Sequence, residues 1–227
     1  MISKMTLPTH VGIIMDGNRR WAKEQGLALL KGHEYVVDRV VENLIERCGE
    51  LGIKHLTLWV FSTDNWQRDV SEVNGLMQLF RTALKTKVAR FIAKGAKLRM
   101  IGDIQKFAPD IREGMEQAMK ASEKNDKITV TFALNYGGRD EILRAVAKMQ
   151  GTEVSEAELA RHLDTAGMPD PDLIIRTGGD QRLSGFMAWQ AVYSELYFTN
   201  TLMPDFGVAQ LDEALEEFGQ RQRRYGK

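Results

Sequence analysis

Short apolar runs with almost no charge alternate in this chain with longer segments in which apolar residues recur every three or four positions. Such runs are typical of strands buried on both faces of a sheet, and the recurring pattern is typical of helices that pack on it. Their alternation predicts an α/β fold with a mostly parallel sheet, helices on both faces and right-handed crossovers. The six predicted strands cover residues 11–15, 56–61, 98–101, 128–134, 173–175 and 196–198.

Helical periodicity is clearest over residues 37–51 and 73–91. Ser155 with Glu158 forms a capping-box pattern that predicts a short helix over residues 156–164. No internal repeat, low-complexity tract or Pro/Ser-rich linker divides the chain. With 227 residues, 43% of them hydrophobic, the chain is long enough to bury a sizeable core, so a single domain spanning residues 1–227 is expected.

The charges balance, with 31 Lys and Arg residues against 31 Asp and Glu residues. No global field favours nucleic acid, which is therefore not an expected partner, and any anion site has to be built locally. The chain's one cysteine, Cys48, rules out an internal disulfide and fits a reducing cytoplasm. Residues 1–10 lack the features of a signal peptide, and no run approaches the roughly 18 apolar residues of a membrane span. A cytoplasmic protein is expected.

Polar turns follow five of the six predicted strands. They lie at residues 16–18, 62–68, 102–103, 135–138 and 176–179. In an open parallel sheet the carboxyl ends of the strands share one edge, and ligands bind at that edge. Any one of these turns alone would be an ordinary strand-to-helix loop, but five on one rim predict a binding site.

The first of these turns can form a phosphate site. Asp16 precedes Gly17, Asn18, Arg19, Arg20 and Trp21. Backbone N–H groups at a helix start, together with an arginine, can hold a phosphate, and a neighbouring carboxylate can hold Mg²⁺. A helix cap is the plain alternative for Asp16. His33 opens the helix after this turn and is the one histidine assigned to the site.

A second basic group runs from Arg176 to Ser184 and includes two glycines and Arg182. Two arginines, close backbone approach and a hydroxyl can surround a diphosphate, whereas surface salt bridges are the alternative. Farther on, Glu195 lies in an aromatic and apolar stretch, where a buried carboxylate needs a metal or an arginine as its partner.

Residues 61–68 combine hydroxyls, an amide, an indole and a guanidinium. That mixture suits a mobile lid over a phosphorylated, partly apolar substrate, with Trp66 as a plain core anchor the alternative. The chain has no Walker A motif, no G-x-G-x-x-G after the first strand, no aspartate-rich motif and no Cys/His spacing for a metal. The sequence therefore argues against a nucleotide-binding protein of these classes and against a zinc site.

Taken in order, several blocks resemble the cis-prenyltransferases, the family of undecaprenyl diphosphate synthases and isoprenyl transferases. The blocks are HVGIIMDGNRRWAK at 10–23, GH at 32–33, FSTDNWQR at 61–68, NYGGRDEI at 135–142, DLIIRTGGDQRLSGF at 172–186 and YSELYF at 193–198. The match extends over nearly the whole chain, and the IIMDGN, IRTGG and ELYF blocks are specific to that family.

This resemblance implies a homodimer of a six-strand α/β fold that houses an elongating chain in an apolar tunnel. It implies Mg²⁺ on Asp16 and Glu195, and isopentenyl diphosphate and an allylic diphosphate, such as farnesyl diphosphate, as substrates. The residues that it assigns to the allylic diphosphate are Gly17, Asn18, Arg19, Arg20, Trp21 and His33. Those for isopentenyl diphosphate are Arg176, Arg182 and Ser184, with Leu183 as a further substrate-binding residue. The closing loop comprises Ser62, Thr63, Asp64, Trp66 and Arg68.

The implied chemistry agrees with these residue types. Magnesium and arginines stabilise a diphosphate leaving group, the allylic cation adds to the isopentenyl double bond, and loss of a proton gives a cis olefin. The family often assigns proton removal to the position of Asn65, but an amide is a poor base, so Asn65 is expected to orient the substrate or a phosphate oxygen. Arg224 and Gly226 resemble an R-x-G motif that reaches into the partner subunit's site. The greasy product, of the kind used as a cell wall lipid carrier, is expected to bring the protein to a membrane surface.

Five positions depart from the family pattern. Leu29 stands where an arginine usually contacts the allylic diphosphate, which puts one substrate contact in doubt. The other four are Val36 for a glycine, Asp64 for a glutamate, Asp69 for a proline and Gly185 for an asparagine.

Two rival functions keep parts of this pattern. A non-catalytic partner subunit would keep the fold but lose residues such as Asp16 and Asn65, and both are present. A phosphatase with Asp16 as nucleophile usually needs a second acidic residue two positions on, where this chain has Asn18.

Overall fold

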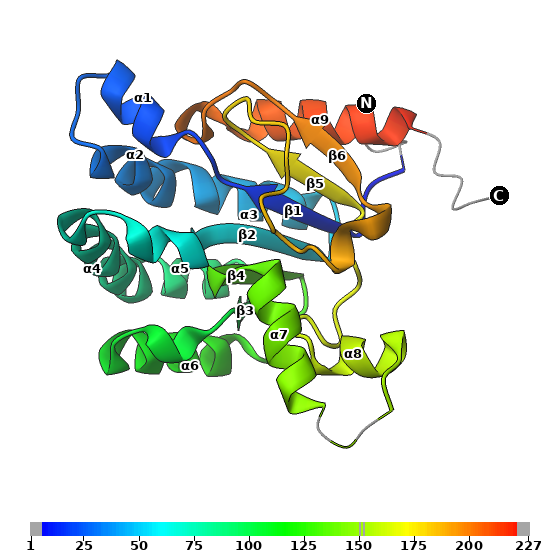
Figure 1. The fold of residues 1–227 in the computed structure, drawn as a ribbon. Coiled ribbons are helices and arrows are strands. Elements are labelled where there is room, and N and C mark those ends of the chain that lie inside the picture. The colour runs from blue at the N-terminus through cyan, green and yellow to red at the C-terminus, as the bar shows by residue number, and fades with distance from the viewer. Residues whose placement is uncertain (1–5, 150, 152, 222–227) are drawn as a thin grey trace.

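The computed structural model describes residues 6–149, 151 and 153–221 (Figure 1). Within these residues, six strands form one sheet in the order β3-β4-β2-β1-β5-β6, and every neighbouring pair is parallel. This confirms the predicted α/β class. The strands are β1 (His10–Ile14), β2 (His55–Ser62), β3 (Ala96–Ile101), β4 (Ile128–Tyr136), β5 (Leu173–Arg176) and β6 (Glu195–Phe198).

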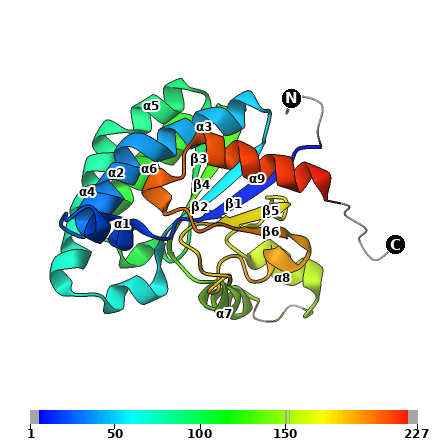
Figure 2. The same ribbon diagram turned by 90° about the horizontal axis from the view of Figure 1, so that it is seen from above.

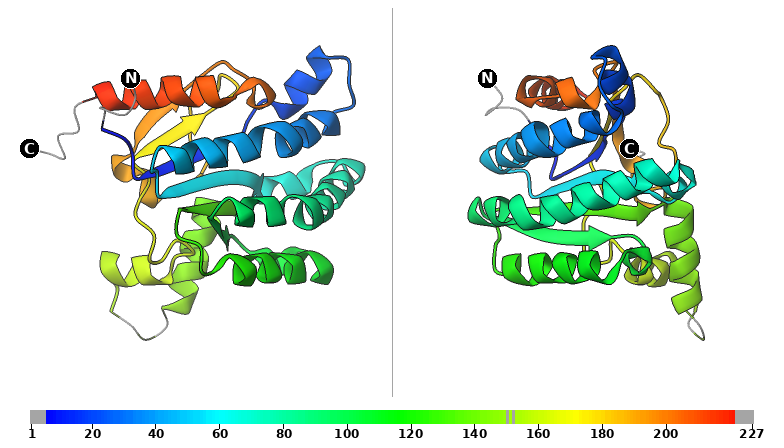
Figure 3. Two further views of the ribbon diagram at one scale, coloured as in Figure 1. Left: turned by 180° about the vertical axis from the view of Figure 1, so that it is seen from behind. Right: turned by 90° about the vertical axis from the view of Figure 1, so that its left-hand side faces the viewer.

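Helices cover both faces of the sheet. Figure 2 shows α7 and α8 on one face and α3, α5, α6 and α9 on the other, and the back view in Figure 3 shows the latter four side by side. The helices are α1 (Asn18–Glu24), α2 (Leu30–Tyr35), α3 (Val41–Glu50), α4 (Val70–Thr86), α5 (Val88–Ala93), α6 (Pro109–Ser122), α7 (Gly138–Lys148), α8 (Glu156–His162) and α9 (Val208–Gln220). The predicted cap of α8 is present, since Ser155 Oγ accepts from Glu158 N at 3.2 Å.

Burial on both faces explains why the strands read as unbroken apolar runs. Along β1, Val11 and Ile13 belong to the larger core under α3 and α9, whereas Ile14 belongs to the core on the opposite face. Alternate side chains therefore enter different cores, and neither face of β1 contacts water. A third core, which includes Phe61 and Phe80, lies where α4 and α6 pack beyond the carboxyl end of the sheet.

A topological switch point lies between β1 and β5. The connection from β1 to β2 runs along the α3 face, whereas the connection from β5 to β6 contributes Phe186 and Met187 to the opposite core. Two connections that leave in opposite directions open a crevice at the carboxyl ends of their strands. The register pairs Ile14 with Arg176, so the polar turns after β1 and β5 meet at this crevice.

Helices α1 and α2 pack so closely that only glycine fits at position 32. A Cβ added to Gly32 would lie 2.0 Å from the carbonyl oxygen of Asn18. Gly32→Ala is therefore expected to force the two helices apart, at a cost of about 2 kcal/mol, and to lower Tm by about 4 to 8 °C. Thermal unfolding followed by circular dichroism measures this shift.

Gly49→Ala is the matched control, because Gly49 also lies in a helix and its nearest neighbour is the flexible end of Lys127. That variant is expected to keep the Tm of the unmodified protein. An equally small change in Gly32→Ala would show that α1 and α2 are not in close contact at this point.

Candidate active site

A cavity of about 740 Å³ opens at the carboxyl edge of the sheet, within the range of small-molecule sites. Its mouth is polar and includes Asp16, Asn18 and Arg176. Its interior is apolar and includes Val41, Phe80, Leu84, Phe91 and Phe132, from α3, α4, α5 and β4. The arrangement places a charged headgroup site over space for a hydrocarbon.

An ion pair between Asp16 and Arg176 lies at the centre of the mouth. Asp16 Oδ2 accepts from Arg176 Nη2 at 2.9 Å, and its Oδ1 accepts from the backbone N–H of Gly17 at 2.7 Å. Arg20 approaches Oδ1 to 3.7 Å. Thr177 fixes the backbone here, since its Oγ1 donates to the Asp16 carbonyl at 2.6 Å and lies 2.9 Å from the Asp16 N–H. The carboxylate is thus held at the switch point.

Arg176 is almost entirely enclosed, with 5% of its side chain exposed. Its Nη1 donates to the carbonyl of Arg182 and to Ser184 Oγ, and its Nη2 donates also to Asp180. These contacts bring Arg176, Arg182 and Ser184 together. Arg182 itself is mostly exposed, and Leu183 lies beside the core on the α7 face, outside the cavity lining.

The turn between β1 and α1 supplies the other side of the mouth. Gly17 adopts a φ of 103°, which glycine alone accommodates readily, and Asn18 starts α1 with its Nδ2 donating to the Met15 carbonyl. Arg19 and Arg20 are exposed beside it. Trp21 is turned toward Asp205, to which its Nε1 donates at 2.9 Å, and is absent from the cavity lining that the described residues form.

His33 lies on α2 at the mouth of the cavity. Burial lowers its pKa to about 4, with the nearby Arg68 acting in the same direction. The imidazole is therefore neutral at pH 7. Glu72 pairs with both Arg68, at 2.9 Å, and Arg19, at 3.7 Å, and so links the loop after β2 to α1. Glu72 is a site neighbour that no sequence motif indicates.

The loop after β2 forms a short 3-10 helix, η3 (Thr63–Gln67). Asn65 Oδ1 accepts from the backbone N–H of Ser62 at 3.0 Å, which fixes the start of the turn. Ser62, Asp64, Asn65 and Arg68 line the cavity, whereas Thr63 and Trp66 are absent from its described lining. Trp66 is half-buried in the third core, so the alternative of a core anchor describes its contacts.

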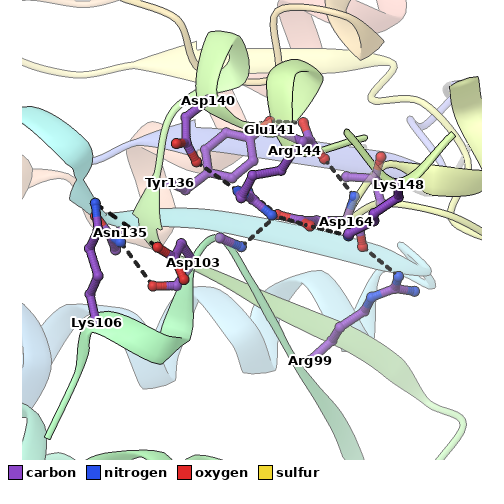
Figure 4. Close-up of polar contacts among 12 residues, drawn as sticks. Arg99, Asp103, Lys106, Asn135, Tyr136, Asp140, Glu141, Arg144, Lys148 and Asp164 are labelled. Atoms are coloured by element: carbon purple, nitrogen blue, oxygen red, sulfur yellow. Dashed lines mark hydrogen bonds and ion pairs between the residues drawn. The ribbon is translucent and has the colours of Figure 1, made fainter. Parts of the chain in front are cut away.

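Asn135 is a buried residue of the site region that was not among the predicted site residues. It has a φ of 47°, accepts from Trp66 Nε1 at 2.7 Å and donates to the Asp103 carbonyl at 2.8 Å. It therefore ties η3 to the turn after β3. Beside it, Figure 4 shows a larger network in which Arg144 donates two hydrogen bonds to the carboxylate of Asp164.

The contacts of that network join elements of the fold to one another. Glu141, whose pKa burial raises, accepts from the Tyr136 hydroxyl at 2.6 Å and from the backbone N–H of Asp164 at 2.9 Å. Asp164 Oδ2 in turn accepts from the backbone N–H of Gly102, so the network joins the segment after α8 to the ends of β3 and β4. The network uses residues of α7 that do not reach the cavity.

Glu195 does not lie beside Asp16 in this chain. It begins β6, in register with Leu173 and thus with Val11, five residues before Asp16. At about 3.3 Å per residue, the two carboxylates are separated by roughly 16 Å along the sheet. Glu195 Oε2 instead accepts from Arg221 Nη1 at 2.9 Å. The carboxylate is partly exposed, and its partner is an arginine, one of the two partners that the sequence analysis considered. Arg224 and Gly226 lie outside the described residues.

The mouth suits a hard cation such as Mg²⁺. Asp16 is partly exposed, and Asn18 Oδ1 is buried without a hydrogen-bond partner in the part of the chain that the structure describes. Mg²⁺ prefers oxygen ligands and is commonly held by one or two carboxylates together with substrate phosphates. Among the described residues, no group of three or more His, Cys, Asp or Glu side chains could hold a metal alone. The residues fit a metal that shares its ligands with a phosphorylated substrate.

Comparison with known proteins gives one consistent result. The Prenyltransf family model, described as undecaprenyl diphosphate synthase, matches residues 14–226. The isoprenyl transferase of Nitrosomonas europaea is 44% identical over 97% of this chain and 86% of its own length. That of Aquifex aeolicus is 42% identical over 98% of this chain and 97% of its own length.

Solved structures agree with the sequences. Lavandulyl diphosphate synthase from Lavandula x intermedia, in complex with dimethylallyl diphosphate, superposes with a TM-score of 0.93 at 35% identity, covering 97% of this chain and 99% of that one. A probable undecaprenyl diphosphate synthase from Campylobacter jejuni gives a TM-score of 0.82 at 32% identity, covering 98% and 100%.

A cationic mouth over an apolar cavity, on a sheet shared with these enzymes, defines a prenyltransferase. The chain belongs to the cis-prenyltransferase family of undecaprenyl diphosphate synthases and isoprenyl transferases.

Proposed function

We propose that this enzyme condenses isopentenyl diphosphate with an allylic diphosphate such as farnesyl diphosphate. The product is a cis-polyprenyl diphosphate such as undecaprenyl diphosphate, and pyrophosphate is released. The observation that carries the proposal is the Asp16–Arg176 pair at the mouth of a cavity whose interior is apolar. Such a site holds a charged headgroup at the rim and leaves the hydrocarbon away from water.

The allylic diphosphate binds on the α1 side of the mouth. Its contacts are Gly17, Asn18, Arg19, Arg20 and the neutral imidazole of His33, with Trp21 behind them. The solved structure of lavandulyl diphosphate synthase, at 35% identity, is a complex with dimethylallyl diphosphate, which supports an allylic diphosphate as the substrate class. The isopentenyl diphosphate headgroup binds on the β5 side, at Arg176, Arg182 and Ser184.

Catalysis by the chain itself is positioning and charge stabilisation. Arginine N–H groups stabilise the negative charge that develops as the allylic C–O bond breaks. The allylic carbon then bonds to the isopentenyl double bond, and a proton leaves the adjacent carbon for a phosphate oxygen. Asn65 orients that substrate, because an amide is too weak a base to take the proton at neutral pH. Closure of residues 62–68 excludes water from the cation.

Asp16 is the residue that would hold Mg²⁺, and Asn18 Oδ1 is a neighbouring oxygen. Glu195 is the second carboxylate of the proposed metal site, but a single chain does not bring it to the mouth. When bound, the ion neutralises charge on the leaving diphosphate.

A homodimer is part of the proposal. Leu143 and Val146 on α7, and Val192 and Tyr193 near the end of the β5–β6 connection, are exposed apolar side chains that a second subunit can cover. Arg224 and Gly226 would then reach the partner subunit's site. The structure has no helix among its described residues that is long and apolar enough to cross a membrane. Contact with a membrane surface would come through the apolar product.

Release of pyrophosphate separates the candidate functions. A transferase supplied with Mg²⁺, isopentenyl diphosphate and farnesyl diphosphate releases pyrophosphate only when both substrates are present. A phosphatase releases inorganic phosphate from either substrate alone, and a non-catalytic subunit releases neither. A colorimetric assay that distinguishes the two anions decides among them.

Val60 is predicted to limit product length. It lines the cavity from β2 and packs against two of the three cores, so its methyl groups occupy space along the path of a growing chain. Val60→Ala is expected to shift the products toward longer chains, measured by mass spectrometry of the extracted lipids. An unchanged product distribution would show that this position does not set the length.

Leu29 is predicted to weaken primer binding. It is 39% exposed and lines the mouth, where an arginine could make charge-assisted hydrogen bonds to the allylic diphosphate. Such bonds contribute about 1.5 to 3 kcal/mol. Leu29→Arg is therefore expected to lower KM for the allylic substrate about tenfold and to leave KM for isopentenyl diphosphate nearly unchanged. Equal effects on both would mean that Leu29 does not face the allylic headgroup.

A further inference from the structure

Asp180 lies between the two arginines on the β5 side of the mouth. Its Oδ2 accepts hydrogen bonds from Arg176 Nη2 at 3.1 Å and from Arg182 Nη2 at 2.7 Å. One anionic oxygen shared by two guanidinium groups is the contact that a diphosphate oxygen would make. We propose that Asp180 is an internal competitor of the isopentenyl diphosphate headgroup, which binds by displacing this carboxylate from both arginines. The inference rests on the proposed function of the site.

The hydrogen bonds of Arg176 show why a partner has to leave. A guanidinium group carries five N–H bonds, four of them on its two terminal nitrogens. Nη1 donates to the Arg182 carbonyl and to Ser184 Oγ, and Nη2 donates to Asp16 and Asp180. Nε is buried without a partner among the described residues. A diphosphate can accept from a terminal nitrogen only where one of these four partners withdraws.

Asp180 is the partner best able to withdraw. Its side chain is 37% exposed and that of Arg182 is 63% exposed, and ion pairs with such exposure contribute little free energy. The N–H groups of Gly178 and Gly179, which directly precede it, donate to the carbonyls of Thr201 and Thr199, so the backbone stays in place and the Asp180 side chain withdraws by rotating about its own bonds. Asp16, by contrast, also accepts from Gly17 and has its backbone fixed by Thr177. Withdrawal of Asp180 would also remove repulsion between its carboxylate and the bound anion.

Calorimetric titration with inorganic pyrophosphate, without added metal, tests this inference. Asp180→Asn is expected to lower the Kd about three- to tenfold, because it removes the competing charge and keeps the size of the side chain. Asp140→Asn is the matched control. Asp140 is 38% exposed and pairs with an arginine four residues away, as Asp180 does, but it belongs to the network in Figure 4 away from the cavity. Its Kd is expected to stay within about twofold.

A weaker or unchanged affinity in Asp180→Asn would overturn the inference and assign Asp180 to holding the arginines in place. The same substitution in an Arg182→Gln background localises the effect, since the gain should shrink when one of the two arginines is absent. A gain of equal size in that background would contradict displacement at this site. Binding is measured without turnover, so the two outcomes are separable. A protein that fails to transfer prenyl groups but binds pyrophosphate more tightly as Asp180→Asn would refute the proposed function and show that Asp180 competes with a diphosphate other than isopentenyl diphosphate.

Discussion

Asp16→Ala is expected to lower kcat by a few hundredfold or more while the fold is retained. The carboxylate lies where the allylic diphosphate is proposed to leave, and its loss removes about 3 to 5 kcal/mol of transition-state stabilisation. The fold should survive, because Asp16 is partly exposed and Arg176 keeps Asp180, Ser184 and the Arg182 carbonyl as partners.

Single-turnover kinetics with both substrates at saturation measures this effect. Tm by calorimetry serves as the control and is expected to change by only about 2 °C. A rate above about one tenth of the unmodified enzyme's would remove Asp16 from the catalytic role assigned to it.

Arg176→Lys is expected to lower kcat/KM for isopentenyl diphosphate about a hundredfold. A lysine keeps the charge but lacks the planar fork that contacts Asp16 and Ser184 at once, so two charge-assisted hydrogen bonds are lost together. Steady-state kinetics with one substrate varied at a time shows whether the loss falls on isopentenyl diphosphate rather than on the allylic partner.

Arg144→Lys is the matched control for this loss. Arg144 makes a bidentate contact with Asp164 and is 25% exposed, but it is absent from the described lining of the cavity. Its variant should lose stability and keep kcat/KM. If both variants lose activity to the same extent, the effect of Arg176→Lys is one of folding and not of substrate binding.

The sheet could be predicted from the sequence because its strands are buried on both faces. Val11, Leu56 and Leu173 belong to continuous apolar runs, and each is fully buried in the structure. The helices were less well defined by periodicity. Residues 37–51 read as one helix, whereas the structure has a π-helical turn, η2 (Val36–Val40), leading into α3. The apolar residues Val36, Val40 and Leu44 are spaced by four positions, a spacing that an α-helix also shows, so periodicity does not distinguish the π-helical turn.

The centre of the site was also predictable, because Asp16 and Arg176 each follow a strand and parallel strands bring such turns to one edge. Asn135 and Thr177 lie in two of the predicted polar turns, but neither was assigned a role in the site. Each acts through a hydrogen bond to a residue far away in sequence, Trp66 for the first and Asp16 for the second, and such a pair depends on the strand order. Residue type alone does not reveal strand order. For the same reason, the position of Glu195 at the opposite edge from Asp16 could not be read from the apolar run around it.

The mass of the lipid product tests the central claim most directly. Purified protein is incubated with Mg²⁺, isopentenyl diphosphate and farnesyl diphosphate, and the extracted lipids are analysed by mass spectrometry alongside the pyrophosphate released. The account predicts a series of products that differ by one isoprene unit, with one pyrophosphate released for each unit added. Recovery of unchanged farnesyl diphosphate, or its hydrolysis to farnesol with release of inorganic phosphate, would contradict the account.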